Sequence, residues 1–265
     1  MGADIKSLRN RIKSVDSTLH LTKAMGLVAS SKIRRAGDAM RKSREYAEIY
    51  KNTAASLCTY RECQLSPFMQ QNEEGETLLV VIAGDRGLAG GYNANIFRLM
   101  REYADARVIP IGKRACDRYQ KEPLYAEGFS YADARAMADM ICREYKEGKL
   151  KRFGIVSTRY HSMMSQEAAV DFILPLTKTE EAPTVSAIFE PDALTVLNAM
   201  IPDFIAGMIV AAVRESFASE VAARRVAMDS AGKNAEEMIS GLSLAYNRAR
   251  QGAITQEITE IVAGA

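Results

Sequence analysis

The sequence has no tryptophan, and its aromatic side chains together make up 7% of its 265 residues. Its four cysteines form no C-x-x-C pair, and only His20 and His161 could supply imidazole ligands. This composition argues against a zinc site and against a disulfide framework. We therefore expect no metal site and a reducing compartment.

Long apolar segments are also missing. The longest run, Phe204 to Val213, has ten residues and is bounded by Asp203 and Arg214. Such a run reaches about half-way across a bilayer. The first residues contain no apolar signal core, so we expect no transmembrane segment, signal peptide or transit peptide.

Proline is absent from both ends of the chain: none precedes Pro67 and none follows Pro202. From Asp4 to about Leu57, alternate steps of three and four residues meet mostly apolar or small side chains. This seven-residue period keeps one seam facing a partner and predicts a coiled-coil helix, about 80 Å long at the usual rise. The predicted seam is Ile5, Leu8, Ile12, Val15, Leu19, Thr22, Gly26, Ala29, Ile33, Ala36, Met40, Ser43, Ala47, Tyr50, Ala54 and Leu57.

Small residues occupy the middle of this seam and allow two helix axes to approach closely. Apolar residues also lie off the seam, where a two-stranded coil would be polar: Leu21, Met25, Leu27 and Val28. They predict a second packing partner, which is either a third segment of the same chain or the surface of another subunit.

The net charge of +2 conceals an uneven distribution. Residues 1–44 hold eleven Lys and Arg against three acidic residues, whereas residues 203–265 hold six basic and eight acidic residues. A basic helix predicts an acidic partner or a nucleic acid. Nucleic acid is the less favoured partner, because no aromatic side chain for base stacking precedes Tyr46.

The middle of the chain alternates apolar runs with helical patterns. This order favours a Rossmann-like, doubly wound α/β domain with a largely parallel sheet. We expect strands at Thr77–Ala83, Val108–Gly112, Phe153–Thr158, Ala168–Leu176 and Val185–Phe189, and helices at 94–104, from Lys113 and at 132–145.

A second long helix is expected from about Asp203, after Pro202, to about Val262. Its predicted seam is Met228, Ala231, Ala235, Met238, Leu242, Ala245, Ala249 and Gly252. A compact domain between two terminal helices brings their ends together and forces an antiparallel coiled coil. The expected domains are a first helix at 1–60, a linker at 61–76, an α/β domain at 77–192 and a C-terminal helix at 193–265.

The glycine-rich loop Gly84–Asn93 follows the first expected strand, where an α/β fold could hold a phosphate. Its glycines do not fit G-x-G-x-x-G, and no P-loop Lys-Ser/Thr follows. We interpret it as a tight turn in which Asp85 and Arg86 make local hydrogen bonds and the glycines allow positive φ.

Catalytic patterns are equally weak. Ser162 and His161 are only sequence neighbours, no G-x-S-x-G elbow occurs, and Glu73 and Glu74 fall in the expected linker. We therefore expect no catalytic residue and no cofactor. Two alternatives stay open: a dinucleotide-dependent enzyme built on the α/β domain, and a coiled-coil scaffold that self-associates.

Motifs in order along the whole chain resemble those of the gamma subunits of F-type ATP synthases. The sequence departs from that family at Gly26, Ala89 and Gly252, where a charged residue, cysteine and serine or alanine are common. It also lacks the long insertion and cysteine pair of chloroplast members, which points to a bacterial protein. The matching stretches are Thr22–Met25, Val28–Ala36, Gly84–Asn93, Ile188–Asp192, Ser219–Met228 and Tyr246–Ala265.

The resemblance implies a non-catalytic rotor that couples proton or sodium flow to ATP synthesis or hydrolysis and regulates ATPase activity. Its helical pair would stand inside a ring of three alpha and three beta subunits, and its α/β domain would contact the epsilon subunit and the c-ring. The protein would be peripheral, on the cytoplasmic side of the bacterial cell membrane.

The resemblance also implies contact residues. Beta and alpha contacts are expected at Lys23, Met25, Leu27, Val28, Lys32, Arg34, Arg35, Arg248, Arg250, Gln251 and Thr255. An apolar tip that turns in a bearing is expected at Ile254, Ile258, Ile261 and Val262.

Overall fold

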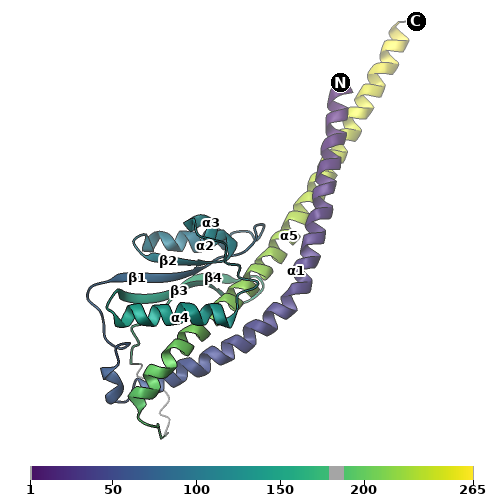
Figure 1. Ribbon diagram of the computed structural model, residues 1–265. Helices are drawn as coiled ribbons and strands as arrows, with labels where there is room; N and C mark the ends of the chain where they lie inside the picture. The colour runs from purple at the N-terminus through teal and green to yellow at the C-terminus, as the bar shows by residue number, and fades with distance from the viewer. Residues whose placement is uncertain (1, 179–187, 265) are drawn as a thin grey trace. The chain divides into compact units, whose positions relative to one another are not determined.

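The computed structural model describes residues 2–178 and 188–264 (Figure 1). The chain forms two compact units. The helical unit comprises the residues up to Ser31 and those from Arg224 onward, and the α/β unit comprises Lys32–Ala223. Two long helices, α1 (Gly2–Leu57) and α5 (Ala193–Ala263), each contribute a segment to both units. The strand expected at Val185–Phe189 lies largely outside the described residues.

The seam predicted for α1 is confirmed, because each of its sixteen positions is buried or half-buried. In the helical unit α1 packs antiparallel to α5. A Cβ built on Gly26 would lie 3.7 Å from Cβ of Met228, and one built on Gly232 would lie 3.6 Å from Oγ1 of Thr22. The small seam residues therefore bring the two helices into direct contact.

The seam predicted for α5 is confirmed at Met228, Ala231, Ala235, Leu242 and Ala249, which are buried or half-buried, and wrong at Met238, Ala245 and Gly252, which are exposed. Ile239, Tyr246 and Ala253 are half-buried and Gly232 is buried. Their neighbours, which the sequence favoured, are Ala231 (half-buried) and the exposed Met238, Ala245 and Gly252. From Met228 the observed seam moves on by four residues to Gly232, whereas the predicted seam moved on by three to Ala231. Every second position after that is therefore shifted by one residue. Ala231 and Gly232 are both small enough for the seam, so the sequence pattern alone did not fix that step.

The α/β unit contains one four-stranded sheet in the order β2-β1-β3-β4. Strands β1 (Glu76–Ile82), β2 (Arg107–Ile111) and β3 (Leu150–Tyr160) are parallel, and β4 (Gln166–Leu174) is antiparallel to β3. The largely parallel sheet confirms the expected α/β class. The short turn between β3 and β4 accounts for the antiparallel edge, because parallel strands need a longer crossover.

Helices cover both faces of this sheet, as a doubly wound fold requires (Figure 1). On one face Leu79, Val81 and Val156 pack with Ile96 of α2 (Tyr92–Leu99) and Met100 of the short helix η2 (Met100–Tyr103). The other face packs against α4 and the α/β-unit segments of α1 and α5. The remaining helices are η1 (Glu62–Leu65), α3 (Lys113–Tyr119) and α4 (Tyr131–Lys146).

Helix α5 begins ten residues earlier than expected, at Ala193, so Pro202 lies inside the helix. The Asp192 carboxylate accepts the backbone N–H of Thr195 at 2.8 Å, as an N-terminal cap does. A proline inside a helix costs about 3 kcal/mol. Burial of the neighbouring Ile201 and Phe204 offsets that cost.

By length and composition alone, α5 contains a window apolar enough to cross a membrane, with a mean hydropathy of 1.9. Half of that window is buried within the protein. The apolar stretch from Leu197 to Val213 belongs to the core under the sheet. Packing within the α/β unit therefore accounts for its hydrophobicity.

Candidate functional site: the surface of the helical pair

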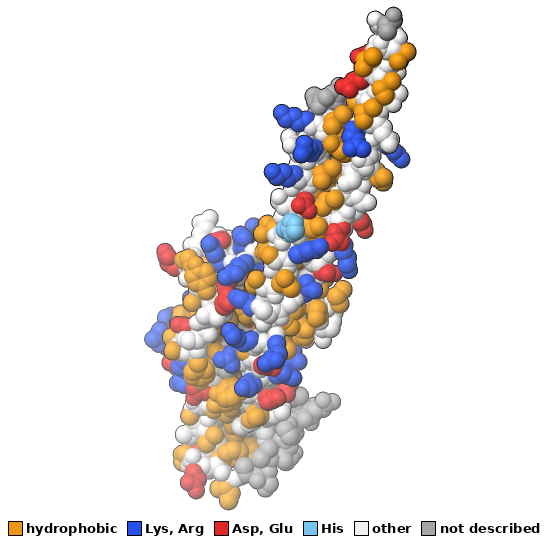
Figure 2. All heavy atoms as spheres, turned by 90° about the vertical axis from the view of Figure 1, so that its right-hand side faces the viewer, with side chains coloured by type: hydrophobic (Ala, Val, Ile, Leu, Met, Phe, Trp, Pro, Cys, Tyr) orange, Lys and Arg blue, Asp and Glu red, His pale blue; other side chains and the backbone are white. Residues whose placement is uncertain are grey.

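An apolar surface on α1 faces solvent. Leu21, Leu27 and Val28 are 58%, 69% and 54% exposed, and Met25 is half-buried. We call these four residues the apolar face of α1. Within the helical unit, the described residues leave Leu21, Leu27 and Val28 uncovered. Figure 2 shows hydrophobic side chains along the paired helices with Lys and Arg beside them.

The predicted cations of α1 fall into two groups. Lys23 forms an ion pair with Glu236 at 2.7 Å, and Lys32 forms one with Glu127. Arg34 and Arg35 are exposed and have no hydrogen bond or ion pair with any described residue. The structure therefore leaves these two arginines available to an external anion. Glu127 and Glu236 carried no sequence signal, because both pairings depend on tertiary structure.

The predicted contact residues near the end of α5 are all exposed. Arg248 and Arg250 bond to nothing in the described part of the chain. The Thr255 hydroxyl donates to the Gln251 backbone oxygen at 2.9 Å. The Gln251 residue itself is exposed. The four residues expected at the tip, Ile254, Ile258, Ile261 and Val262, are between 47% and 73% exposed.

The glycine-rich loop is held by hydrogen bonds within the α/β unit, but those of the Asp85 side chain run to distant segments, so the expectation that they are local was wrong. The Asp85 carboxylate accepts backbone N–H groups of Lys113, Ala126 and Glu127 at 3.1, 2.9 and 2.9 Å. Of its four glycines, Gly90 takes the positive φ that glycine allows and the other three do not, whereas Leu88 also takes a positive φ.

Anion binding by this loop is disfavoured by its neighbour on α5. The buried Glu220 side chain is 2% exposed and accepts the N–H of Arg86 at 3.4 Å. The Asn93 side-chain oxygen accepts a hydrogen bond from the backbone N–H of Gly84 at 2.9 Å. Donors that could cradle a phosphate are thus already used, and a carboxylate lies beside them.

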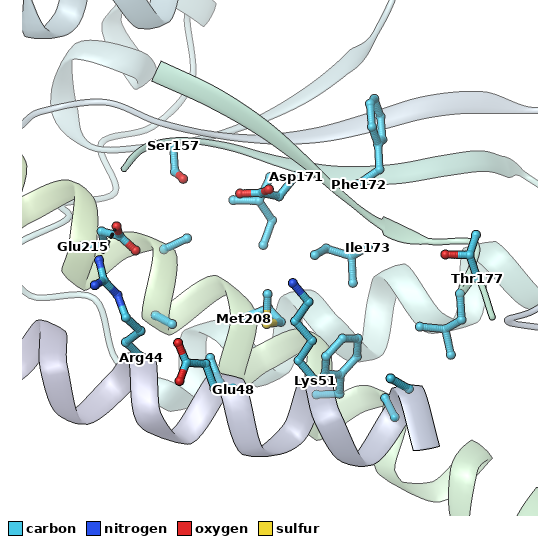
Figure 3. A pocket seen from close by; sticks show the side chains of 18 of the residues that line it. Arg44, Glu48, Lys51, Ser157, Asp171, Phe172, Ile173, Thr177, Met208 and Glu215 are labelled. Carbon is cyan, nitrogen blue, oxygen red and sulfur yellow. Dashed lines mark hydrogen bonds and ion pairs between the residues drawn. The ribbon is translucent and has the colours of Figure 1, made fainter. Parts of the chain in front are cut away.

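A cavity of about 570 Å³ lies in the α/β unit between α1, α5 and strands β3 and β4. Figure 3 shows Arg44, Glu48 and Lys51 of α1 directed toward it. Most of its charges are paired internally, since Arg44 meets Glu215 at 2.8 Å and Arg159 meets Asp171. The lining is electrically balanced and has no histidine to act as a base.

The thiol of Cys58 in this lining is not an activated nucleophile. Burial raises its pKa to about 11, which keeps the sulfur protonated near neutral pH. The described residues hold no group of three or more His, Cys, Asp or Glu side chains that could bind a metal ion.

An antiparallel helical pair with an uncovered apolar face, joined to a doubly wound α/β unit, defines a protein that fits inside a larger assembly. Comparison with known proteins identifies which assembly. The family model described as ATP synthase matches residues 4–265.

The curated relatives are named more specifically. The ATP synthase gamma chain of Ruminococcus albus is 40% identical over 98% of this chain and 96% of its own length. The ATP synthase gamma chain of Moorella thermoacetica is 36% identical over 99% of this chain and 98% of its own length. A gamma chain described as sodium ion specific, from Acetobacterium woodii, is 33% identical, covering 100% and 99%. The chain therefore belongs to the ATP synthase gamma-chain family, whose members form the central stalk of the enzyme.

Solved structures share the fold. A chain of the Euglena gracilis mitochondrial ATP synthase (OSCP/F1/c-ring) superposes with a TM-score of 0.70 at 19% identity, covering 99% of this chain and 94% of that one. A chain of the Tetrahymena thermophila central stalk and c-ring gives 0.61 at 20% identity, covering 80% and 99%.

Proposed function

We propose that this chain is the rotating shaft of an ATP synthase and that it carries out no catalysis itself. Its helical pair stands inside a ring of three alpha and three beta subunits, and its α/β unit contacts the epsilon subunit and the c-ring. The observation that carries this proposal is the uncovered apolar face of α1. Outside an assembly, such exposed apolar side chains favour aggregation, and docking against a partner surface removes them from water.

The proposed mechanism is mechanical coupling. The surface of the helical pair is asymmetric, because the apolar face and free arginines of α1 differ from the polar residues on its other faces. As the shaft turns, each beta subunit meets these faces in succession, and differential contact biases its open and closed states. Proton or sodium flow drives the rotation during synthesis, and the same contacts regulate ATP hydrolysis.

The proposed contacts follow from exposure and charge. On α1 they are the apolar face and the cations Lys23, Lys32, Arg34 and Arg35; on α5 they are Arg248, Arg250, Gln251 and Thr255. Ile254, Ile258, Ile261 and Val262 form the apolar tip of the shaft. The domain division at 1–60, 61–76, 77–192 and 193–265 is part of this proposal, as is a peripheral position on the cytoplasmic side of the bacterial cell membrane.

Co-expression with alpha and beta subunits tests the function directly. We expect one copy of this chain to co-elute with three alpha and three beta subunits and the complex to hydrolyse ATP. A chain that remains outside the ring and forms homodimers on light scattering would instead be a scaffold. Binding of labelled ATP or NAD by the purified chain would favour the dinucleotide-dependent enzyme.

A further inference from the structure

Gly26 creates a gap in the α1 seam, and a side chain of α5 occupies it. A Cβ built on Gly26 would lie 2.8 Å from Nη1 of Arg225. Gly26 is buried and Arg225 is half-buried. The Arg225 guanidinium therefore lies too close to the position of that Cβ for another residue at position 26 to be accommodated unless Arg225 moves.

The charge of this guanidinium is only partly balanced within the described protein. Arg225 forms no hydrogen bond or ion pair with any residue in 2–178 or 188–264, although its charge, after that of Lys233, lowers the pKa of the Asp229 carboxyl one turn away. Its acidic neighbour Asp229 is bound to Lys233 at 3.0 Å, and Lys23 is already paired with Glu236. The Arg225 guanidinium therefore keeps hydrogen-bond donors for an external anion.

A half-buried, unpaired guanidinium loses hydration without gaining a partner, and this loss is recovered when a carboxylate completes it. The planar guanidinium binds a carboxylate through two parallel hydrogen bonds, and arginine is enriched among the residues that dominate protein interfaces. The exposed apolar face of α1 lies in the same turns as Gly26, so one docked segment can contact both.

We propose that Arg225 is a further contact residue of the shaft. It reaches across α1 at Gly26 and binds a carboxylate of an acidic segment of the beta subunit seated on the apolar face of α1. The partner's acidity is inferred from complementarity, because residues 1–44 carry eleven basic and three acidic residues. This inference rests on the proposed function and assigns a role to a residue of α5 in a surface otherwise formed by α1.

A double-mutant cycle on the complex tests the role of the gap. Arg225→Met keeps the length of the side chain and removes its charge, and Gly26→Ala keeps Arg225 but fills the space that it occupies. We expect each variant to dissociate from the alpha–beta ring on the order of tenfold faster, as loss of a charged interfacial hydrogen bond implies. The double variant should be no worse than either single variant, because both remove the same contact.

Two further variants separate charge from packing. Arg225→Lys should recover only part of the affinity, because an ammonium group cannot bind bidentately. Lys149→Met removes an exposed cation that is already paired with Glu147, away from Arg225, and it should leave the dissociation rate within about twofold of the wild type, the usual effect of an exposed pair. Raising the salt concentration should reduce the difference between wild type and Arg225→Met.

The outcomes distinguish this inference from the function on which it rests. If the wild-type chain joins the ring and Arg225→Met dissociates at the same rate, the Arg225 contact is wrong and the rotor function stands. If the double variant dissociates faster than either single variant, by the product of their two rate increases, Arg225 does not act through the gap. A photo-crosslinking residue at Met25 should attach to beta, and attachment only to alpha would overturn the choice of partner. Failure of the wild type to join the ring would reject the proposed function.

Discussion

Glu220 of α5 approaches Gly84 of the glycine-rich loop so closely that a Cβ on Gly84 would lie 2.8 Å from Cδ of Glu220. Near the other end of the loop, the buried Tyr92 hydroxyl donates a hydrogen bond to the Ser216 backbone oxygen at 2.9 Å. The loop is thus fastened to the helix at two points. A side chain at position 84 would force the buried Glu220 side chain to shift.

Gly84→Ala should therefore destabilise the protein by about 1–3 kcal/mol, the usual cost of overpacking a filled site. Gly128→Ala is the matched control, because a Cβ there meets no atom within 4 Å. Chemical denaturation of the two variants gives the comparison. Equal midpoints for Gly84→Ala and the wild type would mean that Glu220 moves aside without cost.

Stability should fall in alkaline solution because of the buried thiols. Burial raises the pKa of Cys58 to about 11 and that of Cys142 to about 12. In the unfolded chain both thiols lose their protons from about pH 8.5. The folded state therefore binds more protons above this pH, and the free energy of unfolding decreases as pH rises toward 11.

Denaturant titrations at pH 7.5, 9 and 10 would measure this decrease. The double variant Cys58→Ala with Cys142→Ala should show a smaller decrease over the same range, although its stability at pH 7.5 will be lower because two buried side chains are shortened. An identical slope in the variant and the wild type would assign the pH dependence to other groups.

The coiled coil of α1 was predictable in detail because its seam includes large residues at fixed spacing, from Ile5 to Leu57. The seam of α5 was not predictable in the same detail. Ala231 and Gly232 are both small enough to lie in the seam, so the sequence does not show which of them does. The sequence also predicted the start of α5 too late, because proline usually lies at or before the start of a helix. In the structure the cap by Asp192 and the burial of Ile201 outweigh this tendency of Pro202.

The candidate surface was predictable only in part. Apolar residues off the seam predict the apolar face of α1 from the sequence alone. The state of each cation was not visible, because the partners Glu236 and Glu127 lie far away in sequence from Lys23 and Lys32. Arg225 was missed for the same reason, since its position over Gly26 depends on the register between two helices.

The division between paired and free cations predicts different effects on coupling. Replacing Arg34 and Arg35 with methionine should lower ATP-driven ion pumping several-fold, since each loses a charged contact of roughly 1 kcal/mol or more. Lys32→Met should have a smaller effect on pumping, because its charge is already paired with Glu127. Pumping by inverted membrane vesicles, with proton and sodium tested separately, gives the readout. Normal pumping by the double arginine variant would remove both residues from the contact surface.

The exposed end of α5 offers the sharpest separation of assembly from folding. Arg250 and Gln251 are exposed, and their side chains make no hydrogen bond or ion pair with the described residues, so replacing both with alanine should leave thermal unfolding within a few degrees of wild type, as expected for surface substitutions. The same double variant should weaken binding to the alpha–beta ring or lower ATPase coupling by tenfold or more, since two polar contacts of about 1 kcal/mol each are lost. Lys6→Ala with Arg9→Ala is a matched control for loss of exposed polar side chains near the end of α1. If Arg250→Ala with Gln251→Ala assembles and turns over normally, the surface at the end of α5 does not hold beta.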